Sequence, residues 1–375
     1  MTARAPRVLV TGAGTGLGNN VMRSLRAADP RLHIVGCHHD RFELRKSPAP
    51  RNYLVPRAGG RGFVAAVHRV VTAERVDVVV PATDADVRAV SQARRRLGCR
   101  VFLPRHRVIE RCQDKYAVTR FLRARGVPAP LTYPVRDLRT VARVFSRLPR
   151  APLAWCRARS GSGSFAATSV QTAVQARAWI AYWRDLRDVP VADFTLCEYL
   201  PGRDFGCQSL WHEGRLVLAK TFERLAYFAG GNQPSGVSSV ASLAKTVVEP
   251  RVVEVCAAAV RALDGRTSGL YCIDLKENAA SVPCITDVNV GRFSLTTGLY
   301  DLVGRHNMAG AYVRLALGES VHFGDAYDRV EDQYLVRDVD TLPEIFHADD
   351  LFNGIEDARG AFHLTQQRHR RTTCQ

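Results

Sequence analysis

The sequence predicts an α/β unit followed by an α+β unit. In roughly the first 110 residues, short apolar runs alternate with amphipathic segments, which is typical of a parallel sheet covered by helices. From about residue 153 onward, apolar runs dominate and fewer helical segments separate them. The chain has 375 residues, of which 46% are apolar and 24% are charged, so it is long enough for about two or three packed domains.

The first unit has the strand and helix order of a Rossmann-like half sheet. Its first strand leads through a glycine-rich turn directly into its first helix, and each later strand follows a helix. We expect strands at residues 7–10, 33–37, 76–80 and 100–103, and helices at residues 19–28, 63–74 and 84–97.

The second unit begins with a helix at about residue 112. This helix is expected to run to residue 125 and to end where Gly126 and Pro128 interrupt the pattern. Residues after Gly318 form a polar appendage, and no internal repeat occurs in the chain. We expect strands at residues 153–157, 194–199, 205–211, 216–222, 269–275 and 283–288, helices at 170–186, 250–263 and 301–317, and an extended segment at 333–337.

The formal net charge of +17 has the sign that nucleic-acid-binding proteins carry. Only five of the 53 basic residues are lysines, and the arginines are spread over the whole chain instead of forming one stripe. The densest runs, at residues 94–96 and 368–371, are expected to be a solvated face and a terminus. Nucleic acid is therefore not an expected partner, although the charge favours anionic small molecules.

The composition also indicates a cytoplasmic protein. Ten cysteines are scattered singly, without a Cys-x-x-Cys pair, which favours buried reduced thiols over disulfides or a zinc site. Cys374 is the cysteine we expect to be most exposed. No run of about 18 apolar residues occurs, and residues 1–11 lack the apolar region of a secretion signal, so no membrane partner is expected.

The glycine-rich turn at residues 12–18 lies between a strand and a helix. Its amides could hold an anion, and Asp40, about twenty residues further on, could meet a ribose hydroxyl in a dinucleotide-binding fold. The same glycines also suit a tight turn that lets the helix pack closely on the strand. We favour the tight turn, because a glycine loop alone is a weak signal.

A group of candidate metal ligands lies near the end of the second unit. Asp287 and Asn289 are two residues apart in one expected strand, so their side chains point to the same face. Asp274 lies on the preceding strand, across a short connection, and can join them. Carboxylate and amide oxygens suit a hard cation, so we expect a Mg²⁺ site here, with Mn²⁺ as an alternative.

A loop rich in glycine and serine follows the strand at residues 153–157. It contains Ser160, Gly161, Ser162 and Gly163, whose amides are able to cover bound phosphates. The alternative is an ordinary hairpin turn.

The order of these elements resembles the ATP-grasp superfamily, specifically the stand-alone carboxylate-amine ligases related to a carbamoyl-phosphate synthetase large-subunit half. The resemblance also includes Asp-Lys at residues 114–115, Glu-Tyr-Leu-Pro-Gly-Arg-Asp at 198–204, and an arginine after the Asp-x-Asn motif. It implies a pre-ATP-grasp domain at residues 1–110, an ATP-grasp domain at 111–318 with lobes of about 111–197 and 198–318, and an appendage at 319–375.

The resemblance implies a nucleotide site made from both lobes. Lys115 and Arg157 match the two positions that hold the α and β phosphates, although the second is commonly lysine followed by proline. Asp204 matches the ribose-binding position, where glutamate is usual. The hinge against the adenine would be formed by Glu198, Tyr199 and Leu200.

The resemblance also implies how the reaction is promoted. Asp274, Asp287 and Asn289 match the metal ligands, and the position of Asp287 usually holds glutamate. Arg292 matches a catalytic arginine that stabilises the transferring phosphate; the alternative for it is a structural ion pair. Lys220, Glu223 and Arg224, together with the loop at 229–236, are expected to face the acceptor substrate.

We therefore expect an ATP-dependent ligase that joins a small-molecule carboxylate, activated as an acyl-phosphate, to an amine, with amino acids or short peptides as substrates and a homodimer as the default assembly. One alternative is a degenerate ATP-grasp protein that only binds nucleotide, as the two shortened acids suggest. Another is an NAD(P)-dependent oxidoreductase using the loop at 12–18, which would leave the Asp-x-Asn motif unexplained.

Overall fold

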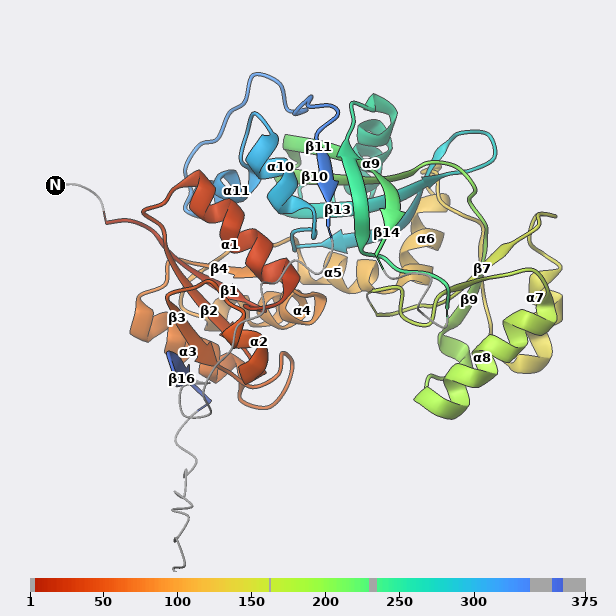
Figure 1. Ribbon diagram of the computed structural model, residues 1–375, viewed down its shortest axis with the longest axis horizontal. Helices are drawn as coiled ribbons and strands as arrows, with labels where there is room; N and C mark the ends of the chain where they lie inside the picture. Colours follow the sequence, from red (N-terminus) through yellow and green to blue (C-terminus); the bar gives the residue numbers. More distant parts are fainter. Residues whose placement is uncertain (1–3, 162, 229–234, 338–352, 360–375) are drawn as a thin grey trace, which may run out of the picture.

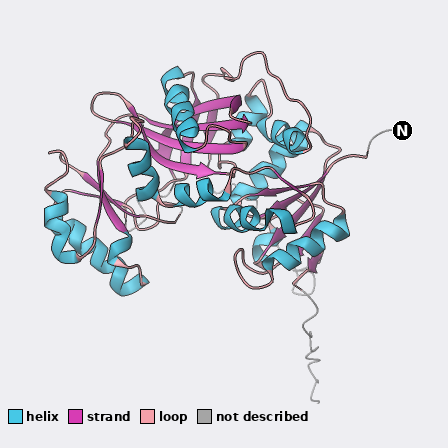
Figure 2. Ribbon diagram, turned by 180° about the vertical axis from the view of Figure 1, so that it is seen from behind, coloured by secondary structure: helices cyan, strands magenta, loops and turns pink. Residues whose placement is uncertain are grey.

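The computed structural model describes residues 4–161, 163–228, 235–337 and 353–359. Three sheets succeed one another across the molecule in Figure 1, with the first at the left, the second at the upper centre and the third at the right. Helices lie between and outside the sheets (Figure 2). Within the described residues, no helix is long and apolar enough to span a bilayer.

The first sheet is entirely parallel, with the strand order β16-β3-β2-β1-β4-β5. Its strands are β1 (Arg7–Thr11), β2 (His33–His38), β3 (Arg51–Leu54), β4 (Val78–Pro81), β5 (Arg100–Val101) and β16 (Ile355–Asp357). Its helices are α1 (Gly16–Ala28), α2 (Arg41–Arg45), α3 (Phe63–Glu74) and α4 (Asp84–Ala93), and a 3₁₀ turn (Arg94–Arg96) follows α4.

Alternation along β1 explains why this sheet is covered on both faces. Val8 and Val10 are fully buried in the cluster that includes α1, whereas Leu9 is fully buried in the cluster that includes α3 and α4. A strand buried on both faces must be apolar along its whole length. The sequence prediction of a parallel α/β unit is confirmed.

The second sheet is antiparallel, with the order β14-β13-β10-β11-β12-β15. Its strands are β10 (Asp204–His212), β11 (Arg215–Tyr227), β12 (Ala241–Thr246), β13 (Gly269–Glu277), β14 (Pro283–Val290) and β15 (Tyr334–Val336). The accompanying helices are α9 (Pro250–Leu263), α10 (Thr297–Val303) and α11 (Met308–Ala316). Helix α9 covers one face of this sheet, and α11 packs on another part of it.

The third sheet is a small antiparallel one with the order β6-β9-β7-β8. Its strands are β6 (Thr132–Pro134), β7 (Ala154–Ala158), β8 (Thr168–Val170) and β9 (Phe194–Glu198), with helices α7 (Val141–Phe145) and α8 (Ala173–Arg187) and 3₁₀ turns at Leu138–Thr140 and Val191–Asp193. Helices α5 (His106–Gln113) and α6 (Lys115–Arg123) connect the first sheet to this one.

Two helix boundaries differ from the expected ones. The helix expected at residues 112–125 begins at Lys115 as α6, and the preceding helix α5 was not indicated by the sequence. Asp114 ends α5 and caps α6 by accepting hydrogen bonds from the amides of Tyr116 and Ala117, both at 3.0 Å. An aspartate with extended backbone stops one helix and starts the next. The helix expected at 301–317 is interrupted after Val303, and α11 begins at Met308.

The expected appendage is built into two sheets. Its extended segment forms β15, which pairs with β12, and the later strand β16 pairs with β3 of the first sheet. The sequence indicated the first of these strands but not the second. Figure 1 shows β16 beside β3, at the edge of the first sheet.

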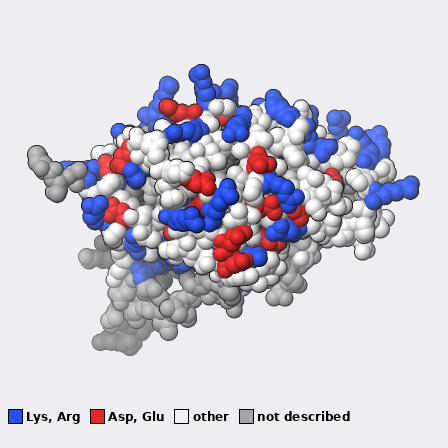
Figure 3. All heavy atoms as spheres, turned by 90° about the horizontal axis from the view of Figure 1, so that it is seen from above, with Lys and Arg blue, Asp and Glu red and all other residues white. Residues whose placement is uncertain are grey.

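The cysteines and the surface charge follow the composition. The nine cysteines within the described residues are free thiols, all buried except the half-buried Cys99, as expected; Cys374 lies outside those residues. On the face in Figure 3, basic side chains extend across the molecule with acidic groups among them.

Candidate active site

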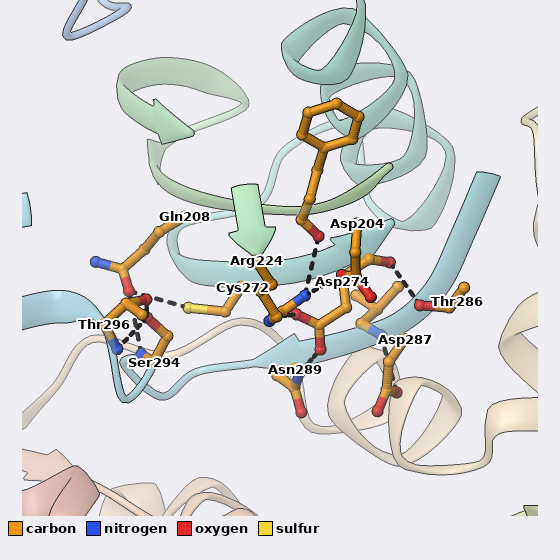
Figure 4. Close-up of polar contacts among 12 residues, drawn as sticks. Asp204, Gln208, Arg224, Cys272, Asp274, Thr286, Asp287, Asn289, Ser294 and Thr296 are labelled. Carbon is orange, nitrogen blue, oxygen red and sulfur yellow. Dashed lines mark hydrogen bonds and ion pairs between the residues drawn. The ribbon is translucent and has the colours of Figure 1, made fainter. Parts of the chain in front are cut away.

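The three candidate metal ligands lie together on two neighbouring strands. Asp274 on β13 and Asp287 on β14 are cross-strand partners, and Asn289 is two residues further along β14. The side-chain Nδ2 of Asn289 donates to Oδ2 of Asp274 at 3.1 Å (Figure 4). The alternation predicted from sequence therefore places all three side chains on one face.

Lys115 reaches this face from the start of α6. Its Nζ lies 2.6 Å from Oδ2 of Asp287, although 172 residues separate the two. The lysine is held in place because its amide donates to the carbonyl of Arg159 at 2.8 Å, and Arg159 pairs with Asp114 at 2.5 Å. Burial alone would raise the pKa of Asp287, but Lys115 and the nearby arginines outweigh it, so this pKa lies below its ordinary value.

Arg157, on β7 of the third sheet, reaches β14, which is called the metal strand below because it carries Asp287 and Asn289. Its Nη1 donates to the carbonyl of Thr286, next to Asp287, at 2.8 Å. The residue is only 7% exposed, and its Nε and Nη2 have no hydrogen-bond partner within the described residues. Unpaired donors of a buried guanidinium are costly, and a phosphate oxygen would satisfy them.

The glycine-serine loop follows β7 and is held by aromatic side chains of α8. Gly161 and Gly163 have φ angles of 104° and 69°, which favour glycine, and Ser162 lies outside the described residues. Ser160 is exposed, and beyond the loop Trp179 of α8 donates to the carbonyl of Ala166 at 3.0 Å. This loop starts beside the Arg157 strand, as a phosphate-covering loop requires.

The expected hinge lies where β9 leaves the third sheet. Glu198 ends β9 and accepts a hydrogen bond from the amide of Leu131 at 3.0 Å, and Tyr199 and Leu200 follow it. A cavity of about 280 Å³ opens beside Glu198. Other residues lining it are Arg123, Gly126, Val127, Pro128, Ala129, Asn278, Val282 and Cys284.

An arginine joins Asp204 to Asp274 on β13, and the sequence did not reveal this connecting role. Arg224 donates to Oδ1 of Asp204 at 2.7 Å and also to Oδ1 of Asp274. Tyr227 donates to the other oxygen of Asp204. Burial lowers the pKa of Arg224, but Asp274 and Asp204 outweigh this, so the pKa lies above its ordinary value and the guanidinium is charged.

Arg292 connects the second sheet to the first unit. Its guanidinium donates to Oδ1 of Asp84 and to Oδ1 of Asn289, the latter at 2.5 Å. Asp84 begins α4 of the first unit, so the ion pair closes the site on that side. Both expected functions of Arg292 remain compatible with this position, since its charge lies next to a metal-strand residue.

A polar cluster below the strand fixes the turn that holds Arg292. Gln208 on β10 accepts a hydrogen bond from the amide of Ser294 at 3.1 Å (Figure 4). It also accepts from Oγ1 of Thr297 at 2.8 Å. The Sγ of Cys272 lies 3.2 Å from Oε1 of Gln208 and 3.2 Å from the carbonyl oxygen of Arg292, so its single S–H is within hydrogen-bond distance of both acceptors. Gly291, with φ 80°, allows the strand to turn where Val87 and Leu103 approach closely.

Lys220 does not face this site. Its Nζ lies 3.2 Å from Asp301 and 3.1 Å from Asp328 in a cluster that is at most 3% exposed. Asp301 also accepts from the amides of Met308 and Ala309 in the first turn of α11, which Asn307 caps. The acceptor role considered for Lys220 is therefore wrong, and most of the loop at 229–236 lies outside the described residues.

The glycine loop of the first unit is closed by the chain itself. A Cβ added to Gly14 would lie 1.6 Å from the carbonyl oxygen of Glu43. Asp40, the candidate ribose ligand of a dinucleotide site, instead caps α2 by accepting from the amides of Phe42 at 2.7 Å and Glu43 at 3.2 Å. The geometry supports the tight-turn interpretation over a dinucleotide site.

The three candidate metal ligands fit a magnesium ion held jointly with phosphates. Within residues 4–161, 163–228, 235–337 and 353–359, no three His, Cys, Asp or Glu side chains form a metal-binding group. Asp274, Asp287 and Asn289 supply two carboxylates and an amide. Magnesium is usually bound by one or two carboxylates together with substrate phosphates, so this incomplete set suits it.

The succession of one parallel and two antiparallel sheets agrees with the expected ATP-grasp fold. No protein-family model matches the sequence, and no curated protein matches it significantly. Solved structures do align with it. An L-amino acid ligase from Bacillus licheniformis aligns with a TM-score of 0.63 and 13% identity, over 85% of this chain and 76% of that one.

Two other aligned structures contain nucleotides. A carboxyaminoimidazole ribonucleotide synthase from Aspergillus clavatus complexed with ATP has a TM-score of 0.63 and 15% identity, over 88% of this chain and 81% of its own. The biotin carboxylase domain of 2-oxoglutarate carboxylase from Hydrogenobacter thermophilus, with MgADP and bicarbonate, has a TM-score of 0.66 and 13% identity, over 88% and 74%. At these identities the likeness establishes the fold.

Proposed function

We propose that this protein is an ATP-dependent ligase that forms an amide between a small carboxylate and an amine, with amino acids or short peptides as substrates. The carboxylate would attack the γ-phosphate of ATP, and the amine would then displace phosphate from the resulting acyl-phosphate. ADP and phosphate would be the coproducts. The aligned L-amino acid ligase and nucleotide-bound carboxylase and synthase structures support this reaction class.

The observation that carries the proposal is the convergence of charged side chains from three parts of the chain on one strand. Lys115 comes from α6, Arg157 from β7, and Asp287 lies between them on β14. Phosphoryl transfer requires positioning and charge neutralisation more than covalent chemistry from the protein. The three side chains supply these two requirements at one place.

The side chains divide the work between nucleotide and metal. Lys115 and Arg157 would hold the phosphates, and the amides after Ser160 would cover them. Asp274, Asp287 and Asn289 would hold Mg²⁺, which when bound neutralises charge on the phosphate oxygens. Arg292 would stabilise the charge that develops on the transferring group.

Release of ADP from Mg·ATP, measured with pools of amino acids and then with single ones, tests the proposal. We expect particular amino acids to stimulate release, and Asp287→Ala to abolish it while the protein stays folded by circular dichroism. Asp185→Ala is the matched control, because this aspartate is exposed and pairs only with its neighbour Arg184 in the described structure. Full activity of Asp287→Ala would refute the metal assignment.

Binding of nucleotide without stimulation by any pool would instead favour a protein that only binds nucleotide. The shortened acids Asp204 and Asp287 are the sequence feature that keeps this second function open. A thermal shift with Mg·ATP separates the two cases from a protein that does not bind ATP at all.

A further inference from the structure

Arg224 occupies a central position in the site. It is the cross-strand partner of Asp204, yet its side chain reaches over β10 to Asp274 on β13. Its side chain is 13% exposed, and the two aspartates are 18% and 29% exposed. One guanidinium thus bridges the candidate ribose ligand and a candidate metal ligand.

A glycine makes this reach possible. Gly206 lies on β10 between Phe222 and Asp274, on the face that Arg224 crosses. A Cβ at this glycine would lie 2.0 Å from the ring of Phe222, so the ring fills the space that a side chain would need. The guanidinium of Arg224 lies 4.8 Å from the centre of that ring, which supports it on its way to Asp274.

The contacts of Asp274 leave little room for a metal ion. Its Oδ1 accepts from Arg224, and its Oδ2 accepts from the amide of Asn289. A cation that binds either oxygen of Asp274 comes close to one of these two donors. Because Arg224 carries the same sign of charge as the metal, it is the direct competitor.

We propose that Arg224 competes with a divalent metal ion for Asp274 and thereby couples metal binding to nucleotide binding. This inference rests on the proposed function, since it takes Asp204 and Asp274 as ligands of ribose and metal. A ribose that hydrogen-bonds Asp204 weakens one end of the bridge, and a metal at Asp274 displaces the other. Each ligand therefore lowers the cost of binding the other, and the coupling is reciprocal.

Binding of Mn²⁺ to the full-length protein, followed by electron paramagnetic resonance, tests the coupling. For the wild type we expect weak binding of the metal alone and about tenfold tighter binding when a non-hydrolysable ATP analogue is present. In Arg224→Gln the metal alone should bind about tenfold more tightly than in the wild type, and the gain from the analogue should shrink. Arg203→Gln is the matched control, because Arg203 pairs with Glu223 and Glu249 outside this bridge.

Thermal unfolding provides a second readout, because Arg224→Gln leaves two aspartates without their partner and can lower stability. The shift in melting temperature caused by Mn²⁺ should be larger in this variant than in the wild type, and Arg224→Lys should lie between them. Equal Mn²⁺ affinities and equal melting shifts in the wild type, Arg224→Gln and Arg224→Lys, with normal binding of the analogue, would overturn the role of Arg224 and leave the proposed function intact. Failure of the analogue to bind any of the proteins would overturn both.

Discussion

Arg157 is the residue whose surroundings are least complete without a ligand. Two of its guanidinium nitrogens lack partners among the described residues, and its third nitrogen anchors it to the metal strand. A site that keeps a buried charge under-satisfied pays in stability and gains in affinity for the anion that completes it.

Arg157→Met is therefore predicted to weaken binding of Mg·ATP by about tenfold to a hundredfold, the loss expected for charge-assisted hydrogen bonds. Its stability should change little, because the substitution also removes unpaired donors. Isothermal titration calorimetry measures the affinity, and Arg157→Lys should retain part of it. Unchanged affinity in Arg157→Met would show that the phosphates bind elsewhere.

Asp86 gives the first unit a dependence on pH. Burial beneath the glycine loop raises the pKa of this carboxyl from 3.8 to about 6, despite hydrogen bonds from Thr83. An acid whose pKa is raised in the folded state binds more protons there than in the unfolded state. Its stabilising contribution is thus complete below the unfolded pKa and is lost as pH rises through about 6.

The difference in unfolding free energy between wild type and Asp86→Asn should consequently fall by about 1 kcal/mol from about pH 5 to about pH 8. Asparagine does not titrate, and the other titrating groups are shared by the two proteins. The change of the difference with pH therefore reports on Asp86. Denaturant unfolding at each pH measures the difference. A difference that is constant over this range, or that grows with pH, would contradict the raised pKa.

At the residue scale, spacing rules predicted part of the site and could not predict the rest. Asp287 and Asn289 share a face because side chains alternate in a strand, and this follows from two positions in the sequence. The bridge made by Arg224 joins residues 20 and 50 positions away, and no local pattern encodes such a contact. Lys220 illustrates the opposite error, since a lysine two strands from the metal ligands is used to neutralise two buried aspartates.

At the scale of elements, the break between α5 and α6 determines where Lys115 lies. Asp114 caps α6 through two backbone amides and also pairs with Arg159, which in turn holds the backbone of Lys115. A continuous helix through residue 114 would turn the lysine to a different direction, because each residue adds about a third of a turn. The cap is thus part of the phosphate site.

Asp114→Ala is predicted to destabilise the protein by about 1 kcal/mol and to weaken Mg·ATP binding several-fold. Differential scanning fluorimetry and calorimetric titration measure the two effects. Asp137→Ala is the control. Asp137 also caps a short turn and pairs with a nearby arginine, but it lies between β6 and α7. If both variants bind Mg·ATP as the wild type does, the cap has no role in the site.

Elements with a clear apolar pattern were predicted from sequence, and several others were not. The core strands β1, β10, β11, β13 and β14 and the helices α3, α8 and α9 lie where the apolar pattern indicates. Helix α2 has five residues and β16 has three, so each contains little more than one period of its pattern. The cap at residue 114 acts through a side chain, which apolar periodicity does not register.

At the scale of the whole molecule, the end of the chain completes the first sheet. Strand β16 pairs with β3, Arg51 forms an ion pair with Glu356, and Arg69 donates to the carbonyl of Ala358. An edge strand without this cover exposes a row of unpaired backbone groups. The C-terminal segment therefore stabilises the N-terminal unit.

A chain that ends after residue 352 should melt about 2–6 °C below the full-length protein, as expected for the loss of one to two kcal/mol in a domain of this size. A chain that ends after residue 359 is the control, because it keeps β16. Scanning calorimetry measures both. Equal melting temperatures for the two truncated chains would show that β16 contributes nothing to stability.

The distance along the chain between β3 and its partner also has a consequence during synthesis. Residues 51–54 leave the ribosome long before residues 355–357 do. Until residues 355–357 are made, the nascent first sheet has an open edge that other chains are able to pair with. Depletion of chaperones, or slower elongation between these two strands, should therefore increase aggregation of the newly made chain.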